Sequence, residues 1–369
     1  MVRRTIVVHL GDQRRARTDS HGIINFSLGL VAALPGALRD DERLIVQVND
    51  ELAPELGRAF LRPGDEVRTI RAPRSILARL WVDHVSVSRL AREVGADVVL
   101  YPKGFLPLTS RLVRARHVPC LHDDIPTHDL RDRELSWRRR VRSAYFTALV
   151  RWSLRRADLR LFVSAFTERA LATRWGSARP GDAVVHEGIT LPRVPVVPVA
   201  ERHPRVVVLG SRHRHKRVDA GLALIAGDPT LQHALEQVLV IGPLDARTQV
   251  GRLPIDHRAG PLASSELAEC IASSRLLVYP SRYEGFGLPP LEALALGTPV
   301  VYRRTGAAQE VLDDVPGGFD DEEAAAFGRA VVEALALDDD RLRVLSDRVW
   351  ARFNWTLVAD RVAAALRTL

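Results

Sequence analysis

The sequence predicts an α/β protein with two halves, each a parallel sheet covered by helices on both faces. Short apolar runs that end at turn residues alternate with longer segments of helical spacing, and strands alternating with helices form parallel sheets. The alternation stops at residues 189–204, which contain four prolines, and then restarts. A length of 369 residues suits about two domains of roughly 100–200 residues.

The first half contains runs that are typical of buried strands, because each is short, apolar and bounded by turn residues. These runs are residues 5–12, 43–48, 96–102, 117–123 and 159–165. Helical spacing lies between them, as in residues 24–34, and the longest helix is expected over residues 135–158.

The proline-rich segment ITLPRVPVVPVAERHP, residues 189–204, is expected to be an extended linker, because proline removes the backbone donors that a helix needs. The alternation that follows predicts four further strands with helices between them. These strands are expected at residues 205–210, 237–243, 275–280 and 298–303.

The domain boundaries follow from this pattern. We expect an N-terminal domain over residues 1–190, a linker over 191–204 and a C-terminal domain over 205–345. The remaining segment, 346–369, is amphipathic and carries Trp350, Phe353 and Trp355. It is predicted to form helices that pack back on the N-terminal domain.

Charge is unevenly distributed along the chain. Residues 1–190 hold 32 Lys and Arg against 22 Asp and Glu, a net charge of +10, and the remainder has a net charge of −2. Such an excess favours an anionic partner: phosphorylated lipid, a membrane surface or nucleic acid. An arginine-rich genome is the plainer explanation, because only Lys103 and Lys216 among the 53 basic residues are lysines. At each of those two positions, our hypothesis is that the site requires the compact point charge of lysine and not the planar guanidinium group of arginine.

The composition also bears on location. No run of about 18 apolar residues appears, and the N-terminal apolar run is too short for a signal sequence. We therefore expect a cytoplasmic protein without a membrane-spanning helix. The only cysteines, Cys120 and Cys270, lie far apart in the sequence, so we expect no disulfide framework and two small buried side chains.

Residues 281–301, SRYEGFGLPPLEALALGTPVV, have the features of a ligand-binding loop followed by a helix. They follow a predicted strand, and α/β sheets bind ligands at the carboxyl ends of their strands. Pro289 and Pro290 suit the first turn of a helix, and Gly297 suits its C-terminal cap. A helix is therefore expected over 288–296, with free amides at its N-terminus for an anion or a hydroxyl group.

Two glutamates flank this loop, Glu284 before the helix and Glu292 one turn into it. A carboxylate can accept hydrogen bonds from two neighbouring hydroxyl groups, as in a ribose or a sugar ring. An isolated pair at this spacing is more often a surface feature. The adjacent GFG, PP and GTPVV segments favour a ligand site instead.

The stretch resembles the donor-site motif of the family 4 glycosyltransferases, retaining enzymes of the GT-B fold, in which two Rossmann-like domains face each other across a cleft. Other segments resemble the same family over nearly the whole chain. They are HGIINFSLGLVAAL (with His21 where a second glycine is usual), CLHDDIP, RRADLRLFVSAFTERAL, VVHEGI (with Glu187 where asparagine is common) and LGSRHRHKR.

The resemblance implies a donor site. Glu284 would lie by the transferred sugar, and Glu292 would hold the nucleotide ribose. The remaining donor-binding positions would be backbone groups of the glycine turns and of the loop before the helix. These are Gly22, Gly210, Phe286, Gly287 and Leu288.

The resemblance also implies the charges that act on the leaving group. Lys216 and Arg212 would neutralise the diphosphate, with Arg214 as a rival to Arg212. His122 would lie beside the donor sugar and the acceptor, although a capping or core histidine is the alternative. The acceptor would attack on the face that the diphosphate leaves, which retains the anomeric configuration, and no residue is predicted as a covalent nucleophile.

No metal and no cofactor besides the donor are expected. Asp123 and Asp124 are adjacent, unlike the spaced acidic pair that holds a metal in other glycosyltransferases. His213 and His215 lack partners at ligand spacing. GT-B enzymes resemble one another in needing no metal.

The implied function is transfer of a hexose from a nucleotide-diphosphate sugar to a hydroxyl of a glycan, a lipid-linked glycan or a natural product. The N-terminal domain would bind the acceptor and the C-terminal domain the nucleotide sugar. Alternatives are another GT-B enzyme such as a nucleotide-sugar epimerase or a phosphorylase, an inactive scaffold, or a basic nucleic-acid-binding protein. Nucleic acid is not expected, because no basic stretch is interleaved with aromatic residues on strands.

The predicted helix 135–158 mixes seven arginines with aromatic residues. Such a helix can dock on an anionic membrane, which would associate the protein with the inner face of a membrane. Alternatively, its aromatic residues face the domain core. The spacing of three and four favours one buried stripe, made of Trp137, Val141, Tyr145, Ala148 and Trp152.

Overall fold

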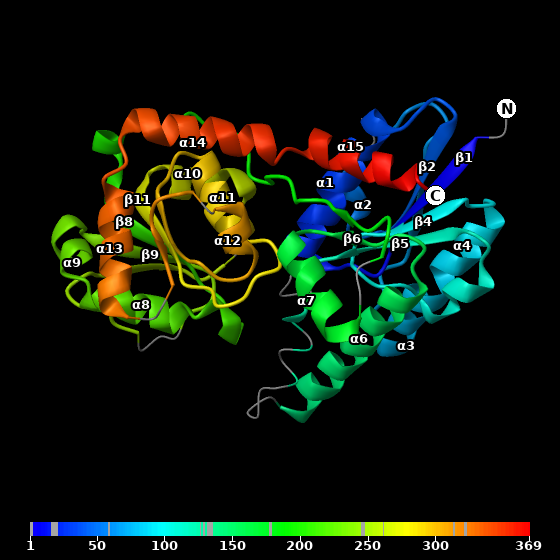
Figure 1. Cartoon of the computed structure of the whole chain (residues 1–369), viewed down its shortest axis with the longest axis horizontal. Coiled ribbons are helices and arrows are strands. Elements are labelled where there is room, and N and C mark those ends of the chain that lie inside the picture. The colour runs from blue at the N-terminus through cyan, green and yellow to red at the C-terminus, as the bar shows by residue number, and fades with distance from the viewer. Residues whose placement is uncertain are drawn as a thin grey trace. The chain divides into compact units, whose positions relative to one another are not determined.

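The computed structural model describes residues 3–15, 21–57, 60–125, 127, 130, 136–176, 179–244, 248–260, 262–312, 314–320 and 323–369. The chain divides into two compact units (Figure 1). Unit 1 comprises the residues up to Gly188 together with Asn354–Leu369, and unit 2 comprises Ile189–Phe353.

Unit 1 is built on a seven-stranded parallel sheet with strand order β3-β2-β1-β4-β5-β6-β7. In the centre, Val7 pairs with Ile45 on one side and with Val99 on the other, and Ile6, Val7 and Val8 have no solvent exposure. The strands are β1 (Arg4–Leu10), β2 (Glu42–Asn49), β3 (Glu66–Ile70), β4 (Val98–Tyr101), β5 (Arg116–Leu121), β6 (Leu161–Phe162) and β7 (Ala183–Val184).

The described helices of unit 1 connect these strands and cover the sheet (Figure 1). They are α1 (His21–Ala37), α2 (Ala53–Leu56), α3 (Ile76–Trp81), the π-helix η2 (Val82–Ser86), α4 (Val87–Glu93), the 3-10 helix η3 (Leu108–Leu112), α6 (Trp137–Arg156), α7 (Ala165–Trp175) and α15 (Trp355–Leu366).

Unit 2 is built on a six-stranded parallel sheet with strand order β10-β9-β8-β11-β12-β13. Its central strands β8 and β11 supply buried valines and leucines such as Val206, Val208 and Leu276 to the main core. The strands are β8 (His203–Leu209), β9 (Gln237–Ile241), β10 (Ile255–Arg258), β11 (Ser274–Tyr279), β12 (Val300–Arg303) and β13 (Gly318–Phe319).

Helices flank this second sheet as well. They are η4 (Val199–Glu201), η5 (Arg214–Lys216), α8 (Val218–Gly227), α9 (Pro229–Ala234), α10 (Ser264–Ala272), α11 (Leu288–Ala295), α12 (Ala307–Val311), α13 (Ala324–Leu335) and α14 (Asp339–Arg352). The prediction of two doubly wound α/β halves is confirmed, because each unit has its own parallel sheet with helical crossovers. That the two halves face each other across a cleft stays a prediction.

Helix α15 belongs to unit 1, although it follows the whole of unit 2 in the sequence. It lies along α1 (Figure 1). The Trp355 ring fills the space above two glycines, since a Cβ atom on Gly29 would lie 2.3 Å from Cε2 of Trp355 and one on Gly188 would lie 2.7 Å from the same atom. The absence of side chains at these two positions lets the indole approach the backbone.

The unit boundaries differ from the boundaries set by the sequence pattern. The linker residues 191–204 belong to unit 2. The C-terminal segment 346–369 divides, since α14 packs on α11 within unit 2 and only α15 packs on α1 within unit 1. The chain changes units at Phe353/Asn354, one residue before α15 begins.

Helix α6 corrects one expectation. Its aromatic stripe is not buried, since Trp137 is 71% exposed and Val141 is 61% exposed. The buried face consists instead of Ser143, Thr147, Leu149, Ser153 and Leu154. Small polar side chains allow close approach here, as in the 2.7 Å hydrogen bond from the Leu106 amide to Oγ of Ser153.

Two smaller predictions concern composition. Cys120 and Cys270 are both buried, as predicted, and neither is in a disulfide. None of the described helices combines the length and the apolar character that crossing a bilayer requires.

Candidate functional site

The loop after β11 is shaped by one glycine. Gly287 has φ of +96°, a left-handed conformation that costs other residues free energy, and it immediately precedes α11. Pro289 and Pro290 then occupy the first turn, where no backbone donor is lost. The helix ends at Ala295, close to the predicted end.

Lys216 and Glu284 meet at the carboxyl ends of β8 and β11. Nζ of Lys216 lies 2.7 Å from Oε1 of Glu284, and the Ser281 hydroxyl donates to the same oxygen at 2.5 Å. The two loops are also joined by their backbones, since the Arg282 amide donates to the His215 carbonyl at 2.7 Å. The structure thus brings together two of the predicted catalytic residues.

Glu284 is held in its charged form. Burial alone would raise the pKa of this carboxyl, but the adjacent Lys216 ammonium and hydrogen bonds from Lys216, Ser281 and Tyr279 hold the pKa below its usual range. Burial raises the pKa of Tyr279 far above its usual value, and the neighbouring Glu284 adds to this effect. At neutral pH the site therefore combines a carboxylate, an ammonium group and a neutral phenol.

Lys216 retains capacity to bind an anion. Its ammonium group has three N–H donors. One donor is directed to Glu284 and one to the Tyr279 hydroxyl at 3.2 Å, and none of the other described residues supplies an acceptor for the third. The side chain is 27% exposed, so an anion in solution can reach it.

The backbone turns sharply directly after Lys216. Arg217 has φ of +52° and is the one non-glycine residue with positive φ in the described part of the chain. Such conformations are uncommon and tend to occur where a neighbouring group must be held in a defined place. Here the turn ends η5 and begins α8.

Glu292 lies in the body of α11 and is 8% exposed. The Thr190 hydroxyl donates a hydrogen bond to its Oε1. Glu284 and Glu292 both raise the pKa of Tyr279, so both carboxylates lie near the phenol. That both carboxylates bind one donor stays a prediction.

Of the other predicted donor-site positions of the loop, Phe286 and Gly287 are buried and Leu288 is half-buried. The ring of Phe286 is 4% exposed and packs edge-on against Phe353, with the ring centres 5.7 Å apart. Leu288 is the first residue of α11. Contacts of the backbone amides of residues 286–288 with a donor stay a prediction.

Gly210 has a packing reason to be glycine. A Cβ atom there would lie 2.4 Å from the Pro243 carbonyl oxygen, because the turns after β8 and β9 approach each other closely. Arg212 is exposed and has no hydrogen bond or ion pair with another described residue. It is not part of the Lys216–Glu284 pair, and its contact with a diphosphate stays a prediction.

His122 lies in unit 1, buried at the end of β5. Its Nδ1 is 3.2 Å from a carboxylate oxygen of Glu187, and its Nε2 is 2.6 Å from the Pro102 carbonyl oxygen. Burial lowers the pKa of the imidazole, but Glu187 and the Pro102 carbonyl outweigh burial and raise it. Both ring nitrogens thus face oxygen atoms of unit 1, and a contact of His122 with donor or acceptor stays a prediction.

Gly22 lies in the first turn of α1 and is exposed. A Cβ atom at this position would meet no atom within 4 Å. Packing in the described structure therefore gives no reason for glycine here, and the predicted contact with a donor remains open.

Sequence reasoning missed a second polar site, in unit 1. Asp12 and Gln13 follow β1, Lys103 follows β4, and Asp83 lies in the π-helix. Lys103 pairs closely with Asp12 and lies 3.8 Å from Asp83. We call these residues, together with His9, the β1–β4 cluster.

The β1–β4 cluster contains unusual buried groups. Burial raises the pKa of Asp83 to about 7 and lowers the pKa of Lys103 to about 7. Burial, with Lys103 nearby, lowers the pKa of His9 to about 3. Buried polar atoms without a hydrogen-bond partner among the described residues are His9 Nε2, Asp12 Oδ1, Gln13 Oε1 and Asp83 Oδ1.

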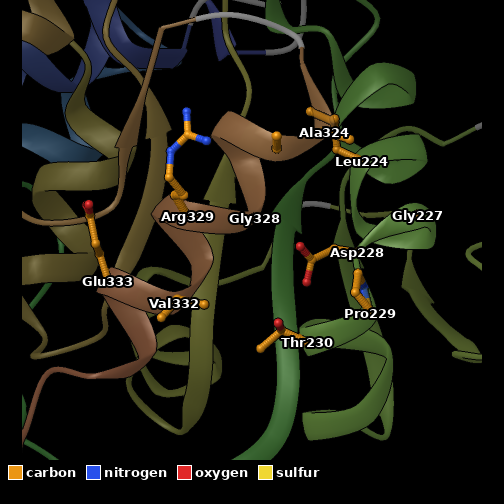
Figure 2. A pocket seen from close by; sticks show the side chains of 11 residues that line it. Leu224, Gly227, Asp228, Pro229, Thr230, Ala324, Gly328, Arg329, Val332 and Glu333 are labelled. Atoms are coloured by element: carbon orange, nitrogen blue, oxygen red, sulfur yellow. The ribbon is translucent and has the colours of Figure 1, made fainter.

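An open groove of about 630 Å³ lies elsewhere on unit 2, between α8, α9 and α13 (Figure 2). It contains none of the predicted site residues. Its buried carboxylate, Asp228, caps α9 by accepting a hydrogen bond from the Leu231 amide at 2.8 Å. We assign no function to this groove.

Part of unit 2 matches a known family. Residues 203–337 match the model of the Glycosyl transferases group 1. This segment runs from β8 past α13 and includes Lys216, Glu284 and Glu292.

Curated relatives are similar over shorter stretches. An MMP alpha-(1->4)-mannosyltransferase of Mycolicibacterium hassiacum is 39% identical over 127 residues, which are 31% of this chain and 30% of the relative. A GDP-mannose-dependent alpha-(1-6)-phosphatidylinositol dimannoside mannosyltransferase of Mycobacterium tuberculosis is 33% identical over 159 residues, 42% of this chain and 40% of the relative. The chain thus matches less than half the length of either relative.

Solved structures are similar over the whole chain. HepE of Anabaena, in complex with UDP and glucose, has a TM-score of 0.66 at 17% identity, covering 99% of this chain and 100% of the other. Sucrose-phosphate synthase from Thermosynechococcus elongatus has a TM-score of 0.65 at 19% identity, covering 99% of each chain. Such low identities show the fold alone, which is the predicted GT-B fold.

Proposed function

We propose that this chain is a hexosyltransferase that moves a sugar from a nucleotide-diphosphate sugar to an acceptor hydroxyl with retention. The observation that supports this most is the Lys216–Glu284 pair, 2.7 Å apart. It lies within the segment that matches the group 1 model, next to a helix N-terminus at the carboxyl edge of the sheet, where α/β proteins bind ligands. Because two relatives are mannosyltransferases by name, mannose is the first sugar to test.

Lys216 stabilises the leaving diphosphate in this proposal. Negative charge develops on the diphosphate oxygens as the glycosidic bond breaks, and a fixed cation in a partly dry site stabilises it strongly. The third N–H donor of Lys216 reaches the diphosphate, and the free amides at the start of α11 add positive potential. Arg212, which is exposed and unpaired among the described residues, can swing toward the same group.

The two carboxylates divide the donor between them. Glu292, buried one turn into α11, holds the ribose hydroxyls. Glu284, at the entrance of the helix, accepts hydrogen bonds from the sugar while its charge is kept by Lys216. No residue is proposed as a covalent nucleophile, and no metal or cofactor besides the donor takes part.

A thermal-shift screen with a panel of nucleotide sugars tests this function. We expect one sugar nucleotide to raise the melting temperature and oligonucleotides to have no effect. Glu292→Ala should lose the shift from the nucleoside diphosphate alone, because its carboxylate binds the ribose. Glu284→Ala should keep that shift and lose the additional shift that the sugar provides.

Glu236→Ala is the matched control, since Glu236 is an exposed glutamate of unit 2 outside the proposed site. Calorimetry with the nucleoside diphosphate alone should give wild-type affinity for this control and for Glu284→Ala. Equal losses in Glu284→Ala and Glu292→Ala would contradict the division of roles. Stabilisation by oligonucleotides alone would contradict the function itself.

For the acceptor we propose the β1–β4 cluster of unit 1. Its four buried atoms without a hydrogen bond among the described residues and the amine of Lys103 form a mixed set of donors and acceptors, which suits the hydroxyl groups of a sugar. The relative from Mycobacterium tuberculosis acts, by its name, on phosphatidylinositol dimannoside. A sugar-containing acceptor that is linked to a lipid is therefore our proposal for this chain.

Lys103→Met tests the acceptor site. The shorter reach and lost charge of methionine should raise KM for the acceptor by about tenfold, the worth of one charged hydrogen bond, and leave nucleotide affinity unchanged. The matched control is Arg111→Met, on the exposed surface of η3, with wild-type kinetics expected. An unchanged acceptor KM in a folded Lys103→Met protein would remove the cluster from the acceptor site.

A further inference from the structure

Helix α3 presents an apolar face to solvent. None of its six residues is buried. Ile76 is 79% exposed, Leu77 is 77% exposed and Trp81 is 48% exposed, and Leu80 lies among them on the helix surface. At about 100° per residue these four side chains fall within an arc of about 140°, so they form one continuous face.

Helix α6 lies beside α3 and η2 within unit 1 (Figure 1). The Arg79 guanidinium stacks on the ring of Phe146 at 5.9 Å, and His84 Nε2 is 2.7 Å from the Tyr145 hydroxyl. All residues from Trp137 to Arg142 are exposed. Val141 lies one turn before Tyr145 on α6 and Trp137 about two turns before it, and both are exposed apolar side chains.

Arginines accompany this face, and carboxylates are scarce within the described residues of α3, η2 and α6. Helix α6 contains no aspartate or glutamate, and between residues 71 and 92 the only carboxylate is Asp83, which is buried. We define the α3–α6 surface by its apolar and basic residues. They are Ile76, Leu77, Leu80, Trp81, Trp137, Val141, Arg74, Arg79, Arg138, Arg139, Arg140 and Arg142.

We propose that the α3–α6 surface docks on an anionic lipid membrane. Exposed aliphatic and tryptophan side chains can enter the boundary between headgroups and acyl chains, while the arginines remain at the level of anionic headgroups. Each arginine near such a surface contributes attraction that falls with salt.

The chemistry of the surface separates a membrane from other anionic partners. Nucleic acid would satisfy the arginines but offers no apolar phase for Ile76 and Leu77. A bilayer supplies both an apolar interior and a charged surface, in the arrangement that the α3–α6 surface presents. The proposal is independent of sugar transfer, because docking is measured without donor or acceptor.

The test is co-sedimentation with vesicles of phosphatidylcholine and phosphatidylglycerol, compared with vesicles of phosphatidylcholine alone. The protein should sediment with the anionic vesicles and stay in the supernatant with the neutral ones. Raising salt from about 0.01 M to about 1 M shortens the Debye length from about 30 Å to about 3 Å, and binding should fall steadily across this range.

Two double variants separate the apolar contribution to vesicle binding from the basic contribution. Ile76→Ser combined with Leu77→Ser should lower vesicle partitioning by roughly tenfold. Arg138→Gln combined with Arg142→Gln should lower it by about fivefold for each arginine, which corresponds to about 1 kcal/mol per charge. The matched controls lie on α14 of unit 2: Val344→Ser, where the side chain is 58% exposed, and Arg341→Gln combined with Arg343→Gln.

Three results would overturn the proposal. The protein could stay in the supernatant with anionic vesicles at low salt. The α3–α6 variants could bind vesicles as well as their α14 controls do. The apolar double variant could instead abolish a dimer seen by sedimentation equilibrium while vesicle binding is absent, which would make the surface a protein interface.

Discussion

Lys216→Ala is expected to lower turnover by about 10²–10³-fold, the scale of losing one charge contact to a transition state. The variant removes the donor proposed for the diphosphate and leaves Glu284 without the cation that holds down its pKa. Single-turnover transfer, together with a melting curve, measures the effect. The fold should persist, because the lost ion pair lies at the edge of the sheet and Lys216 is partly exposed.

The pH profile adds an independent readout. With Lys216 absent, burial raises the pKa of Glu284, so the residual activity should fall at a higher pH than in the wild-type protein as the medium is acidified. Arg212→Ala is the comparison, since Arg212 is exposed and has no hydrogen bond or ion pair with another described residue, and a smaller loss with an unchanged profile is expected. Near-normal transfer by a well-folded Lys216→Ala protein would remove Lys216 from the mechanism.

Gly29→Ala is expected to destabilise unit 1 by about 1–3 kcal/mol, the usual cost of overpacking. Its Cβ would lie 2.3 Å from Cε2 of Trp355, so the indole or the backbone of α1 must move. Gly36→Ala is the matched control in the same helix. It meets no atom within 4 Å and should be neutral or stabilising by up to about 1 kcal/mol, because alanine favours a helix.

Urea unfolding of the two variants measures this difference. Combining Gly29→Ala with Trp355→Leu should recover part of the loss, since the smaller side chain leaves room for the new methyl group. Such non-additivity is expected only for residues in contact. Equal stability of the Gly29→Ala and Gly36→Ala proteins would show that Trp355 does not need the glycine.

The sequence predicted the centre of each sheet better than its edges. The runs that were expected as strands correspond to β1, β2, β4, β5, β6, β8, β9, β11 and β12. The strands it missed, β3, β7, β10 and β13, are the outermost strands of the two sheets. Edge strands pair on one side only. The residues of β3 and β10 are half-buried or exposed, so these strands lack the continuous apolar run that marks a central strand.

In the candidate site too, the features that depend on neighbouring residues could be predicted, and the contacts between residues far apart in the sequence could not. One short stretch contains Glu284, Gly287 and the start of α11, and its glycines and prolines predict a turn followed by a helix. The hydrogen bond from Thr190 to Glu292 joins residues 102 positions apart, and no local pattern predicts such a pairing. In the β1–β4 cluster, the rarity of lysine was the one clue to Lys103.

Helix α6 shows where periodicity misleads. The stripe at Trp137 and Val141 has the spacing of a buried face, yet the helix turns its serines and threonines inward. Periodicity reports that one face differs from the other, and the packing partner decides which face is covered. For α6 that partner donates a hydrogen bond to a hydroxyl oxygen, as the Leu106 amide does to Ser153.

The membership of α15 in unit 1 has a consequence for biosynthesis. The 165 residues of unit 2 leave the ribosome between the first part of unit 1 and the helix that completes it. At about 5–20 residues per second, this interval lasts roughly 10–30 s, during which α1 has no indole over Gly29. Unit 2 is therefore able to finish folding before unit 1 does. Until Trp355 has been made, unit 1 keeps an apolar helix face uncovered, and chaperones can bind this face.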